Sequence, residues 1–299
     1  MTAIDLFQAN RPALFGVAYR MLGSATDAED VLQDAWLRYS ASEPADLRSV
    51  KAYLTTIVTR LCLDRLKSAR TMREEYVGPW LPEPVATDTV RGPERSLALA
   101  ESLSLAFMVL LETLSPEERA VFLLREVFDY EYGEIAAIVD TTSANCRQLF
   151  HRAKGRLAER KPRFNAGTEE TRALIDRFVR AFRDGNEDEL TRVLAADVGL
   201  WSDGGGKALA ARRPVLGRDH VVALLLGIRR TAPATGIALE SVTHEIVEVN
   251  GEPAIVMRVA GAIEAVYVPA VEEGAIAALR IVRNPDKLTY ISRQLAGYQ

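Results

Sequence analysis

Cysteine is scarce in this 299-residue sequence, which contains only Cys62 and Cys146. The two lie far apart, each within a predicted helix, and no group of residues has the spacing of metal ligands, so we expect reduced core thiols and no metal or cofactor. No apolar run approaches the ~20 residues that span a bilayer. The first fifteen residues also lack the basic start and apolar core of a secretory signal. Together these absences predict a cytoplasmic protein without a membrane segment.

Net charge is also low, at −4, but the charges are segregated along the chain. The first 47 residues carry three Arg against seven Asp and Glu, whereas the stretch from Arg48 to Arg73 carries seven Lys and Arg against Asp64 alone. Alternating acidic and basic segments indicate more than one kind of partner. The composition, 48% hydrophobic and 26% charged, is typical of a globular chain, and its length suggests two or three domains.

The clearest pattern lies between residues 132 and 163. Apolar Ile135, Ala136 and Val139 predict a helix over 132–139. Asp140 to Thr142 predicts a turn, and Ser143 is the expected N-cap of a second helix. One face of that second helix is expected to pack, through Cys146, Leu149, Phe150, Ala153 and Leu157. The other polar or basic positions are Asn145, Arg147, Gln148, His151, Arg152, Lys154 and Arg156.

Amides and guanidiniums can bind base edges, and Lys and Arg neutralise phosphates. Two helices joined by a tight turn, with such groups on the second helix, predict a helix-turn-helix that reads the major groove. The alternative is an ordinary amphipathic hairpin with a solvated basic face. We favour DNA binding, because Arg147 to Arg163 holds seven Lys and Arg and a single Glu in a chain of negative net charge.

The N-terminal part predicts a helix over 5–22, interrupted near Pro12, and a second helix capped by Thr26 or Asp27. Asp27, Asp30 and Asp34 form an acidic stripe on this second helix, which is either a solvated face or a docking surface for a basic protein. A long helical stretch follows, with a second cationic side. Its basic residues are Arg60, Arg65, Lys67, Arg70 and Arg73.

Residues 76–98 are rich in proline and glycine and predict a linker. Trp80 and Leu81 lie between Pro79 and Pro82, which makes this part semi-rigid and apolar. Such a patch is expected to dock on another surface.

From residue 166 onward the pattern predicts an α+β domain. We expect helices over 168–184 and 188–195 and a third capped by Asp219, with a curved antiparallel sheet. The expected strands are 199–201, 237–239, 246–249, 254–259, 262–268 and 275–282. DGGGK (203–207) lacks the spacing of a nucleotide-binding loop and is expected to be a flexible hairpin turn, and NPDKL (284–288) is expected to be a turn.

Residues 1–75, with DAEDVLQDAWLR and KAYLTTIVTRLCLDRLKSAR, resemble the region-2 helical bundle of bacterial extracytoplasmic-function (ECF) sigma factors. Residues 99–165 resemble their region-4 helix-turn-helix. The resemblance implies that the chain binds core RNA polymerase and promoter DNA, with region 2 melting and reading the −10 element and region 4 reading the −35 element. The implied polymerase-facing residues are Asp27, Asp30, Gln33, Asp34 and Trp36. The implied DNA-binding residues are Arg60, Arg65, Lys67, Arg70, Ser143, Asn145, Arg147, Gln148, His151, Arg152 and Lys154. Arg60 stands where many relatives carry Asn, and Asp140 where Gly is common, though Asp tolerates a left-handed backbone.

Residues 166–299 resemble a SnoaL-like domain, a cone-shaped α+β barrel with an apolar pocket. WLPEP, DGGGK and NPDKL together resemble the ECF subgroup with this domain fused at the C-terminus. The expected regulatory contact residues between domains are Trp80, Leu81, Pro82, Asp203, Gly204, Lys207, Asn284, Pro285, Asp286 and Lys287. We expect Trp80 and Leu81 to dock on the 203–207 and 284–288 loops; the alternative is packing of Trp80 on the N-terminal domain.

The leading interpretation is a non-enzymatic sigma factor regulated in cis by its C-terminal domain, whose pocket is a candidate site for a small ligand. One alternative is a ligand-responsive helix-turn-helix regulator that never joins polymerase. Another is a bifunctional protein with a cyclase-like C-terminal domain, since Asp203 with His220 or His244 are candidate acid–base pairs. We favour a regulatory pocket over catalysis, because the fold does not fix the function.

Overall fold

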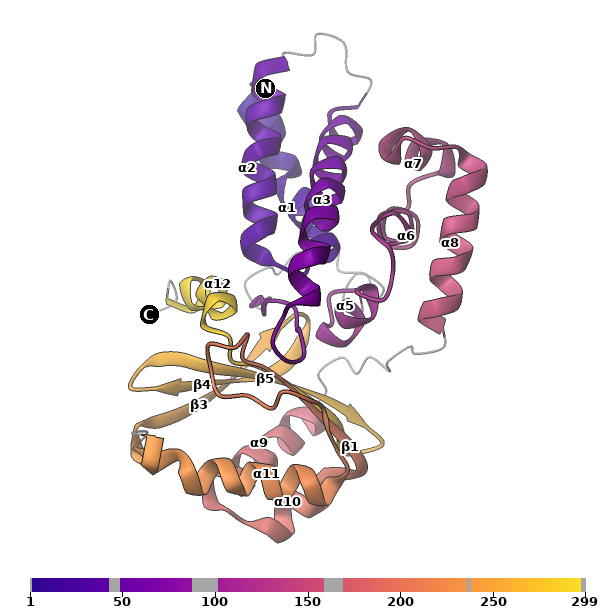
Figure 1. The fold of residues 1–299 in the computed structure, drawn as a ribbon. Helices are drawn as coiled ribbons and strands as arrows, with labels where there is room; N and C mark the ends of the chain where they lie inside the picture. Colours follow the sequence, from indigo (N-terminus) through magenta and orange to yellow (C-terminus); the bar gives the residue numbers. More distant parts are fainter. Residues whose placement is uncertain (1, 43–48, 88–101, 159–168, 236–237, 297–299) are drawn as a thin grey trace. The chain divides into compact units, whose positions relative to one another are not determined.

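The computed structural model describes residues 2–42, 49–87, 102–158, 169–235 and 238–296 (Figure 1). The chain divides into two compact units. Unit 1 comprises Met1–Glu75, Leu97–Leu103 and Phe107–Pro162, and unit 2 comprises Tyr76–Ser96, Ser104–Ala106 and Arg163–Gln299. None of the helices in the described ranges is long and apolar enough to cross a membrane.

Unit 1 begins with three helices, α1 (Ala3–Leu22), α2 (Ala25–Ser42) and α3 (Val50–Glu74). A capping box between Thr2 and Asp5 starts α1, and Gly23 ends it in the left-handed conformation, with φ of 69°. The predicted break near Pro12 is wrong, because α1 continues through that residue. The predicted cap of α2 is also wrong, since the Ser24 hydroxyl accepts from the Asp27 amide at 3.0 Å and the helix starts earlier.

The rest of unit 1 contains α5 (Leu105–Leu111) except its first two residues, which belong to unit 2, and then α6 (Pro116–Phe122), the π-helical turn η1 (Leu123–Val127), α7 (Tyr132–Val139) and α8 (Ser143–Ala158). The predicted bounds of α7 are confirmed, and α8 starts one residue before the predicted position, because Thr142 rather than Ser143 is its cap. Asp140 has a φ of 56°, so the turn between them has the expected left-handed residue. Their shared core includes Val121, Leu124, Tyr130, Ile135, Ile138, Cys146 and Leu149.

Buried polar contacts join the N-terminal helices to the later helices of unit 1. The guanidinium of Arg119, of which 3% is exposed, donates to the Met21 carbonyl at 2.6 Å and pairs with Glu112 at 2.7 Å. The Tyr130 hydroxyl donates to Thr55 at 2.9 Å in a buried position. Because buried polar groups are costly unless they are paired, these bonds favour one packed arrangement of α1, α3, α6 and α7.

Unit 2 is built on a six-stranded sheet with the order β2-β1-β6-β5-β4-β3. The strands are β1 (Leu194–Asp203), β2 (Val215–Leu216), β3 (Val242–Val249), β4 (Glu252–Val259), β5 (Ala262–Glu272) and β6 (Ala275–Val282). The prediction of a wholly antiparallel sheet is wrong, because β1 and β6 pair in parallel. The predicted strand at 237–239 is also wrong at Leu239, which begins a 3-10 turn (Leu239–Ser241), while Ile237 lies outside the described residues.

Helices α9 (Glu169–Asp184), α10 (Glu187–Val193) and α11 (Arg218–Thr231) cover one face of this sheet, and α12 (Pro285–Ala296) lies on the other (Figure 1). A short 3-10 turn, Ala232–Thr235, follows α11. The predicted cap at Asp219 is wrong, since α11 begins at Arg218 after Gly217. The turn predicted at 284–288 is instead the start of α12, where the Asn284 side chain accepts from the Asp286 amide at 3.1 Å and Pro285 occupies the first helical position.

Candidate functional site

The second helix of the helix-turn-helix, α8, has one packed and one solvated face. Cys146, Leu149, Ala153 and Leu157 are buried, as the sequence predicts. The Thr142 hydroxyl accepts from the Asn145 amide at 3.2 Å, so the cap is Thr142 and the predicted cap at Ser143 is one residue late. Ser143 and Asn145 are half-buried. The exposed polar side chains of α8 are Arg147, Gln148, His151, Arg152, Lys154 and Arg156.

Neighbouring side chains orient several of these exposed groups. The Arg147 guanidinium lies over the Tyr132 ring at 5.2 Å from its centroid. Arg152 and Arg156 pair with the nearly buried Glu118 at 3.4 and 2.7 Å, near the C-terminal half of α8.

The remaining polar groups of α8 differ in how they are held. Lys154 is 3.9 Å from Glu126. Within the described part of the chain, Gln148 and His151 make no hydrogen bond or ion pair. Gln148 and His151, near the middle of α8, therefore offer uncommitted donors and acceptors at its surface.

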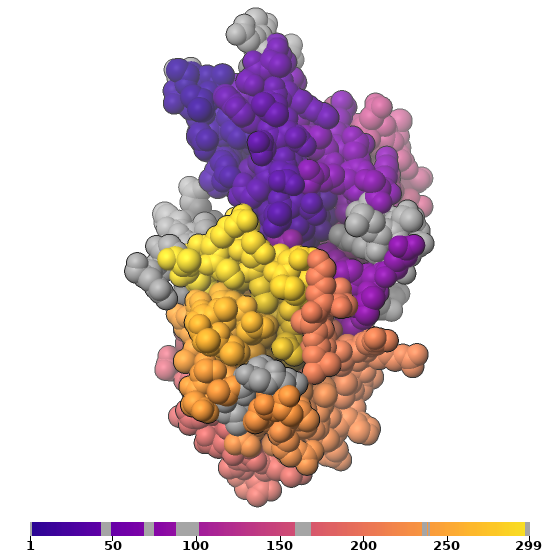
Figure 2. Space-filling model, turned by 60° about the vertical axis from the view of Figure 1, so that its left-hand side comes forward, coloured from indigo at the N-terminus to yellow at the C-terminus, as the bar shows by residue number. Residues whose placement is uncertain are grey.

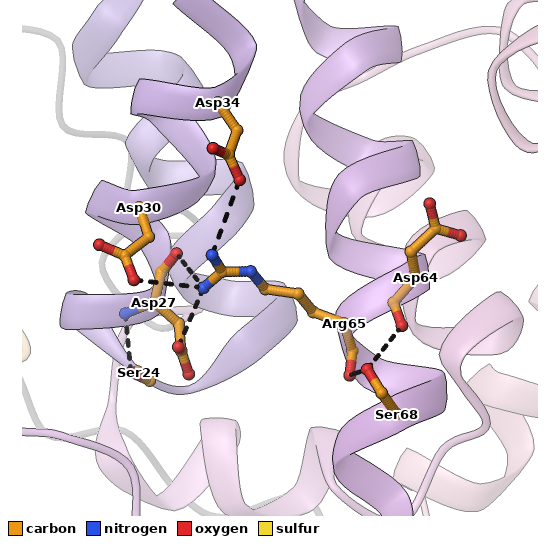
Figure 3. Close-up of polar contacts among 7 residues, drawn as sticks. All are labelled: Ser24, Asp27, Asp30, Asp34, Asp64, Arg65 and Ser68. Carbon is orange, nitrogen blue, oxygen red and sulfur yellow. Dashed lines mark hydrogen bonds and ion pairs between the residues drawn. The ribbon is translucent and has the colours of Figure 1, made fainter.

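The acidic stripe of α2 surrounds a single guanidinium (Figure 3). Arg65, which extends from α3, lies 3.0 Å from Asp27, 3.6 Å from Asp30 and 3.8 Å from Asp34. All four side chains remain partly exposed, so the cluster keeps an excess of negative charge at the surface.

The other two residues expected on the polymerase-facing helix lie in different settings. Gln33 is exposed. Trp36 is half-buried and packs on Phe7, with ring centroids 5.2 Å apart.

The basic side of α3 contacts the helix-turn-helix. Arg60 donates two hydrogen bonds of 3.0 Å, to the carbonyls of Ala137 and Ile138 at the end of α7. A cation at this position also complements the negative end of the helix dipole. Lys67 pairs with Glu117 at 3.6 Å. The side chain of Arg70 lies outside the described residues.

Residues 76–87, which we call the strap, are seated on unit 2. The strap's first anchor is Asp203, which is completely buried. One Asp203 oxygen accepts from the Tyr76 hydroxyl at 2.5 Å. The other oxygen accepts from the Leu81 amide at 2.8 Å and from the Lys287 ammonium at 2.7 Å. Burial and the bond to Asp203 raise the pKa of the Tyr76 hydroxyl, which keeps it a donor.

Lys287 is the second half of this anchor. Its ammonium also donates to the Leu81 carbonyl at 2.6 Å, and it lies over the rings of Trp80 and Tyr76, at 4.1 and 4.8 Å from their centroids. Both backbone groups of Leu81 are therefore bound by one buried ion pair. The expected contact of Trp80 and Leu81 with the 203–207 and 284–288 segments is present in the structure.

The loop after β1 has glycine at two positions, Gly204 and Gly205, where neighbouring atoms leave no room for a Cβ. A Cβ on Gly204 would lie 2.3 Å from the Ala208 carbonyl oxygen, and one on Gly205 would lie 2.2 Å from the Asn284 amide nitrogen. Gly205 also has a φ of 58°. The Asn284 amide in turn donates to the Tyr76 hydroxyl at 3.0 Å. The turn predicted at 203–207 is present, with the Lys207 amide donating to the Gly204 carbonyl at 2.9 Å, and its glycines allow the close contact with Asn284.

An ion pair between Lys207 and Asp286 joins the loop after β1 to the first turn of α12. In Figure 2 the yellow surface of α12 lies directly beside the coral surface of this loop. Pro82, like its neighbours in the strap, is buried.

A second anchor holds the end of the strap. The Val85 amide donates to the Asn250 side chain at 3.1 Å, and the Asn250 amide donates back to the Val85 carbonyl at 2.9 Å. Ala86 exchanges bonds of 2.9 and 3.2 Å with the Gln294 side chain, and Thr87 bonds Glu248 through its amide and its hydroxyl.

This second anchor was not predicted from the sequence. The available signal was Asn250-Gly251 between two strands, which is typical of a hairpin turn whose amide side chain is left to bind elsewhere. The end of the strap is therefore held by side chains as well as by the sheet backbone.

The candidate acid–base pairs are not brought together in unit 2. Asp203 is bound to the strap and to Lys287, and its neighbour Ser202 faces the opposite side of β1. His244 lines the cavity on that opposite side, and burial lowers its pKa. The Nδ1 atom of His220 lies 3.0 Å from the Leu216 carbonyl. No group of side chains among the described residues has the composition of a metal site.

A cavity of about 460 Å³ lies between the sheet and its covering helices. Its walls are mostly apolar side chains from α9, α11, the loop after β1, and strands β1, β3, β4, β5 and β6, and it also contains a few polar groups. Both features are typical of small-molecule sites.

A helix-turn-helix with an exposed basic face, packed with a helical bundle, makes this a DNA-binding protein of the transcription apparatus. Family models agree: residues 6–71 match sigma-70 region 2, and residues 104–157 match sigma-70 region 4. Two sigma-70 regions are thus present, in the order in which the sequence predicted them.

The relatives match over nearly the whole chain. ECF RNA polymerase sigma factor SigJ of Mycobacterium tuberculosis is 36% identical, over 96% of this chain and 93% of its own length. A probable ECF sigma factor SigI of the same species is 30% identical, over 97% and 96%. The crystal structure of SigJ superposes with a TM-score of 0.73 at 33% identity, covering 96% of this chain and 98% of that one. The chain therefore belongs to the ECF RNA polymerase sigma factors, as its sequence resemblance implied.

Proposed function

We propose that this sigma factor divides promoter recognition between its two DNA-binding surfaces, α8 for the −35 element and α3 with its preceding loop for the −10 element. The observation that supports this most directly is the exposed polar face of α8, which includes Arg147, Gln148 and His151. In vitro transcription with core polymerase tests the proposal. Promoter-specific transcripts that need this chain are expected, and transcripts that form equally without it would contradict the assignment.

Substitutions on α8 separate base reading from phosphate binding. Arg147→Ala or Gln148→Ala is expected to cost about 1–3 kcal/mol at the cognate upstream element only. Lys154→Ala is expected to weaken binding to all sequences alike and to reduce the salt dependence. Equal effects of both kinds of variant on cognate and scrambled promoters would mean that another face of α8 meets DNA.

The acidic cluster of Asp27, Asp30 and Asp34 is proposed as the polymerase-binding surface. Reversing two charges in an Asp30→Arg/Asp34→Arg variant should reduce capture of core polymerase while the thermal midpoint of unit 1 changes little, because exposed substitutions usually shift stability by less than ~0.5 kcal/mol. Asp64→Arg on the exposed surface of α3 is the matched control. Undiminished capture by the double variant would leave the cluster as a solvated face.

We further propose that the strap regulates transcription in cis. The strap joins the two DNA-binding regions in sequence, and its seating on unit 2 is supported by two separate sets of hydrogen bonds. A tethered partner has a high effective concentration, so a seated strap is the populated state even if each contact is modest. Its release would lengthen the free chain between the two regions and change how they engage a promoter.

Trp80→Ala, Asp203→Ala and removal of the residues after Gly167 test this regulation. Each is expected to change transcript yield while unit 1 keeps its circular dichroism signal. Unaltered yield from all three would refute regulation through the strap.

Unit 2 is proposed to act without catalysis, in the cytoplasm with polymerase, and to hold a small molecule in its cavity. Support comes from the separation of Asp203 from His244 and His220, so that neither candidate acid–base pair is assembled, and from the cavity itself. The same transcription assay, supplied with small molecules from cell extract, tests this role. A change in transcript yield would support a regulatory pocket, and chemical conversion of the added molecule by the chain would contradict a role without catalysis.

A further inference from the structure

The cavity of unit 2 is apolar along its length but has polar groups at one region of the sheet. Its apolar walls are formed by Phe182, Leu200, Leu224, Leu225, Ile228 and Ile281. Register places Ser202 beside Ile281 on β6, and Ile281 beside Tyr267 on β5, so these three side chains share one row on the cavity face. Arg283 follows two residues after Ile281 and also lines the cavity.

Two polar groups at this end of the cavity, the Tyr267 hydroxyl and the Arg283 Nε, have a weak hydrogen-bond acceptor or none. The Tyr267 hydroxyl is buried and donates only to the Met257 sulfur, at 3.6 Å, and a thioether is a weak acceptor. The Nε of Arg283 is buried without a hydrogen-bond partner, while its Nη1 donates to the Leu209 carbonyl at 2.6 Å. Burial raises the pKa of Tyr267, and the positive charge of Arg283 acts in the opposite direction. Unpaired buried donors are costly. A ligand that supplies a hydrogen-bond acceptor to the Arg283 Nε and the Tyr267 hydroxyl is therefore favoured here.

Charge around the cavity has one sign. Arg183, Arg229 and Arg283 line it, and no described lining residue is a carboxylate. Arg183 pairs outside the lining with Asp184 at 3.0 Å, and Arg229 donates to the Arg183 carbonyl at 2.9 Å. Arg283 has no carboxylate partner among the described residues. A guanidinium next to a phenol is a common receptor for a carboxylate, since both donate to its oxygens.

We propose that the cavity binds a small amphipathic carboxylate, with its apolar body along α11 and its carboxylate at Arg283 and Tyr267. The volume is within the range that holds a ligand of drug size. The bound carboxylate accepts from the Arg283 Nε and the Tyr267 hydroxyl and so supplies the missing acceptor. This inference adds a ligand class to the proposed role of unit 2 and does not depend on promoter recognition.

The site is coupled to the strap through adjacent residues. Ser202 lines the cavity and Asp203 holds the strap; likewise Arg283 lines the cavity and Asn284 contacts Tyr76 of the strap. The backbone amides of Arg283 and Asn284 both donate to the Asp203 carbonyl, at 2.7 and 2.9 Å. A ligand bound to the Arg283 side chain therefore contacts the same short backbone segment, 283–284, whose amides bond Asp203 and whose Asn284 side chain contacts the strap.

Calorimetric titration of the full chain with three probes of equal chain length tests the proposal: dodecanoate and dodecylammonium below their micellar concentrations, and dodecanol below its solubility limit. Dodecanoate is expected to bind one to one and at least tenfold more tightly than either other probe. Arg283→Gln should remove most of this preference, Tyr267→Phe should reduce it several-fold, and Arg230→Gln, on the exposed side of α11, is the matched control. Ile228→Trp, which fills the cavity, should abolish binding.

Equal affinity for the three probes, or no binding of dodecanoate, would overturn the proposal even if every variant were unstable, because this comparison uses the unaltered chain. Binding that survives Ile228→Trp in a folded variant would place the site elsewhere and would also overturn it. Since no polymerase or DNA is present, these outcomes are independent of whether the chain initiates transcription. Exchange of the Leu81 amide, measured with and without dodecanoate, reports the coupling to the strap; an unchanged rate would refute the coupling.

Discussion

Removing the Asp203 carboxylate should release the strap and destabilise unit 2. Asp203 is fully buried and Lys287 is 8% exposed, so Asp203→Ala leaves a buried ammonium without its carboxylate. Breaking one side of a buried pair typically costs about 3–5 kcal/mol. The same change also removes the acceptor of the Tyr76 hydroxyl and of the Leu81 amide. We therefore expect a loss of at least ~3 kcal/mol in the free energy of unfolding of unit 2.

The remedy should be removal of the second charge. An Asp203→Ala/Lys287→Met variant has no buried charge left at this site, and replacing a whole pair by apolar groups is often close to neutral. We expect the double variant to recover at least ~2 kcal/mol of the single variant's loss, which is a coupling energy within the usual range for residues in contact.

Tryptophan fluorescence during urea unfolding can measure this in the full chain. Trp36 lies in unit 1 and Trp80 and Trp201 in unit 2, so a Trp36→Phe background makes the signal specific to unit 2. Hydrogen exchange of the 76–87 segment reports release of the strap. A loss below ~0.5 kcal/mol for Asp203→Ala, with the Leu81 amide still protected, would refute the argument that this pair holds the strap.

Three further expectations follow from other residues. Arg60→Ala removes both hydrogen bonds to the end of α7 and should weaken the packing of α3 on the helix-turn-helix by about 1 kcal/mol. Faster hydrogen exchange of the α7 amides would report this loss. Unchanged exchange would show that these exposed hydrogen bonds do not contribute to stability. Asp140→Gly should raise the melting temperature of unit 1, since glycine adopts its φ of 56° without steric cost, and a lower value would mean that the Asp side chain stabilises the turn. Burial raises the pKa of Glu252 from 4.5 to about 7, so the folded state binds the proton more tightly than the unfolded state. The free energy of unfolding of unit 2 should therefore fall by on the order of 2–3 kcal/mol as pH rises from about 4.5 to 7. Glu252→Gln should flatten this decline, and an unchanged slope would contradict the assignment.

Local signals explain which elements the sequence could predict. Residues 132–143 combine a helical apolar period with a polar turn, and both act within a few residues, so α7 and, to within one residue, the start of α8 follow directly. The start of α12 carried a local signal too, since Asn284 followed by Pro285 is typical of a helix N-terminus, but the pair was interpreted as a turn. Pairing of β1 with β6 joins segments about 80 residues apart and has no local signature, which is why the parallel pair was missed.

The candidate sites show the same division. Proline-flanked Trp80 and Leu81 indicated docking, because an apolar patch in a linker needs a cover. The role of Arg65 could not be predicted, since a cationic helix face looks the same whether it meets DNA or an acidic neighbour. Only the packing of α3 beside α2 places that guanidinium among the Asp27, Asp30 and Asp34 carboxylates.

Because Arg65 already occupies the acidic cluster, a basic partner must compete with Arg65 for the three carboxylates. A cationic surface that approaches Asp27, Asp30 and Asp34 must displace a guanidinium already seated there, so association is an exchange of one ion pair for another. Such an exchange changes the number of paired charges little, and its affinity should vary less with salt than the three carboxylates alone would suggest. The displaced Arg65 would then be free on α3, where it becomes available to a phosphate only after the partner has bound.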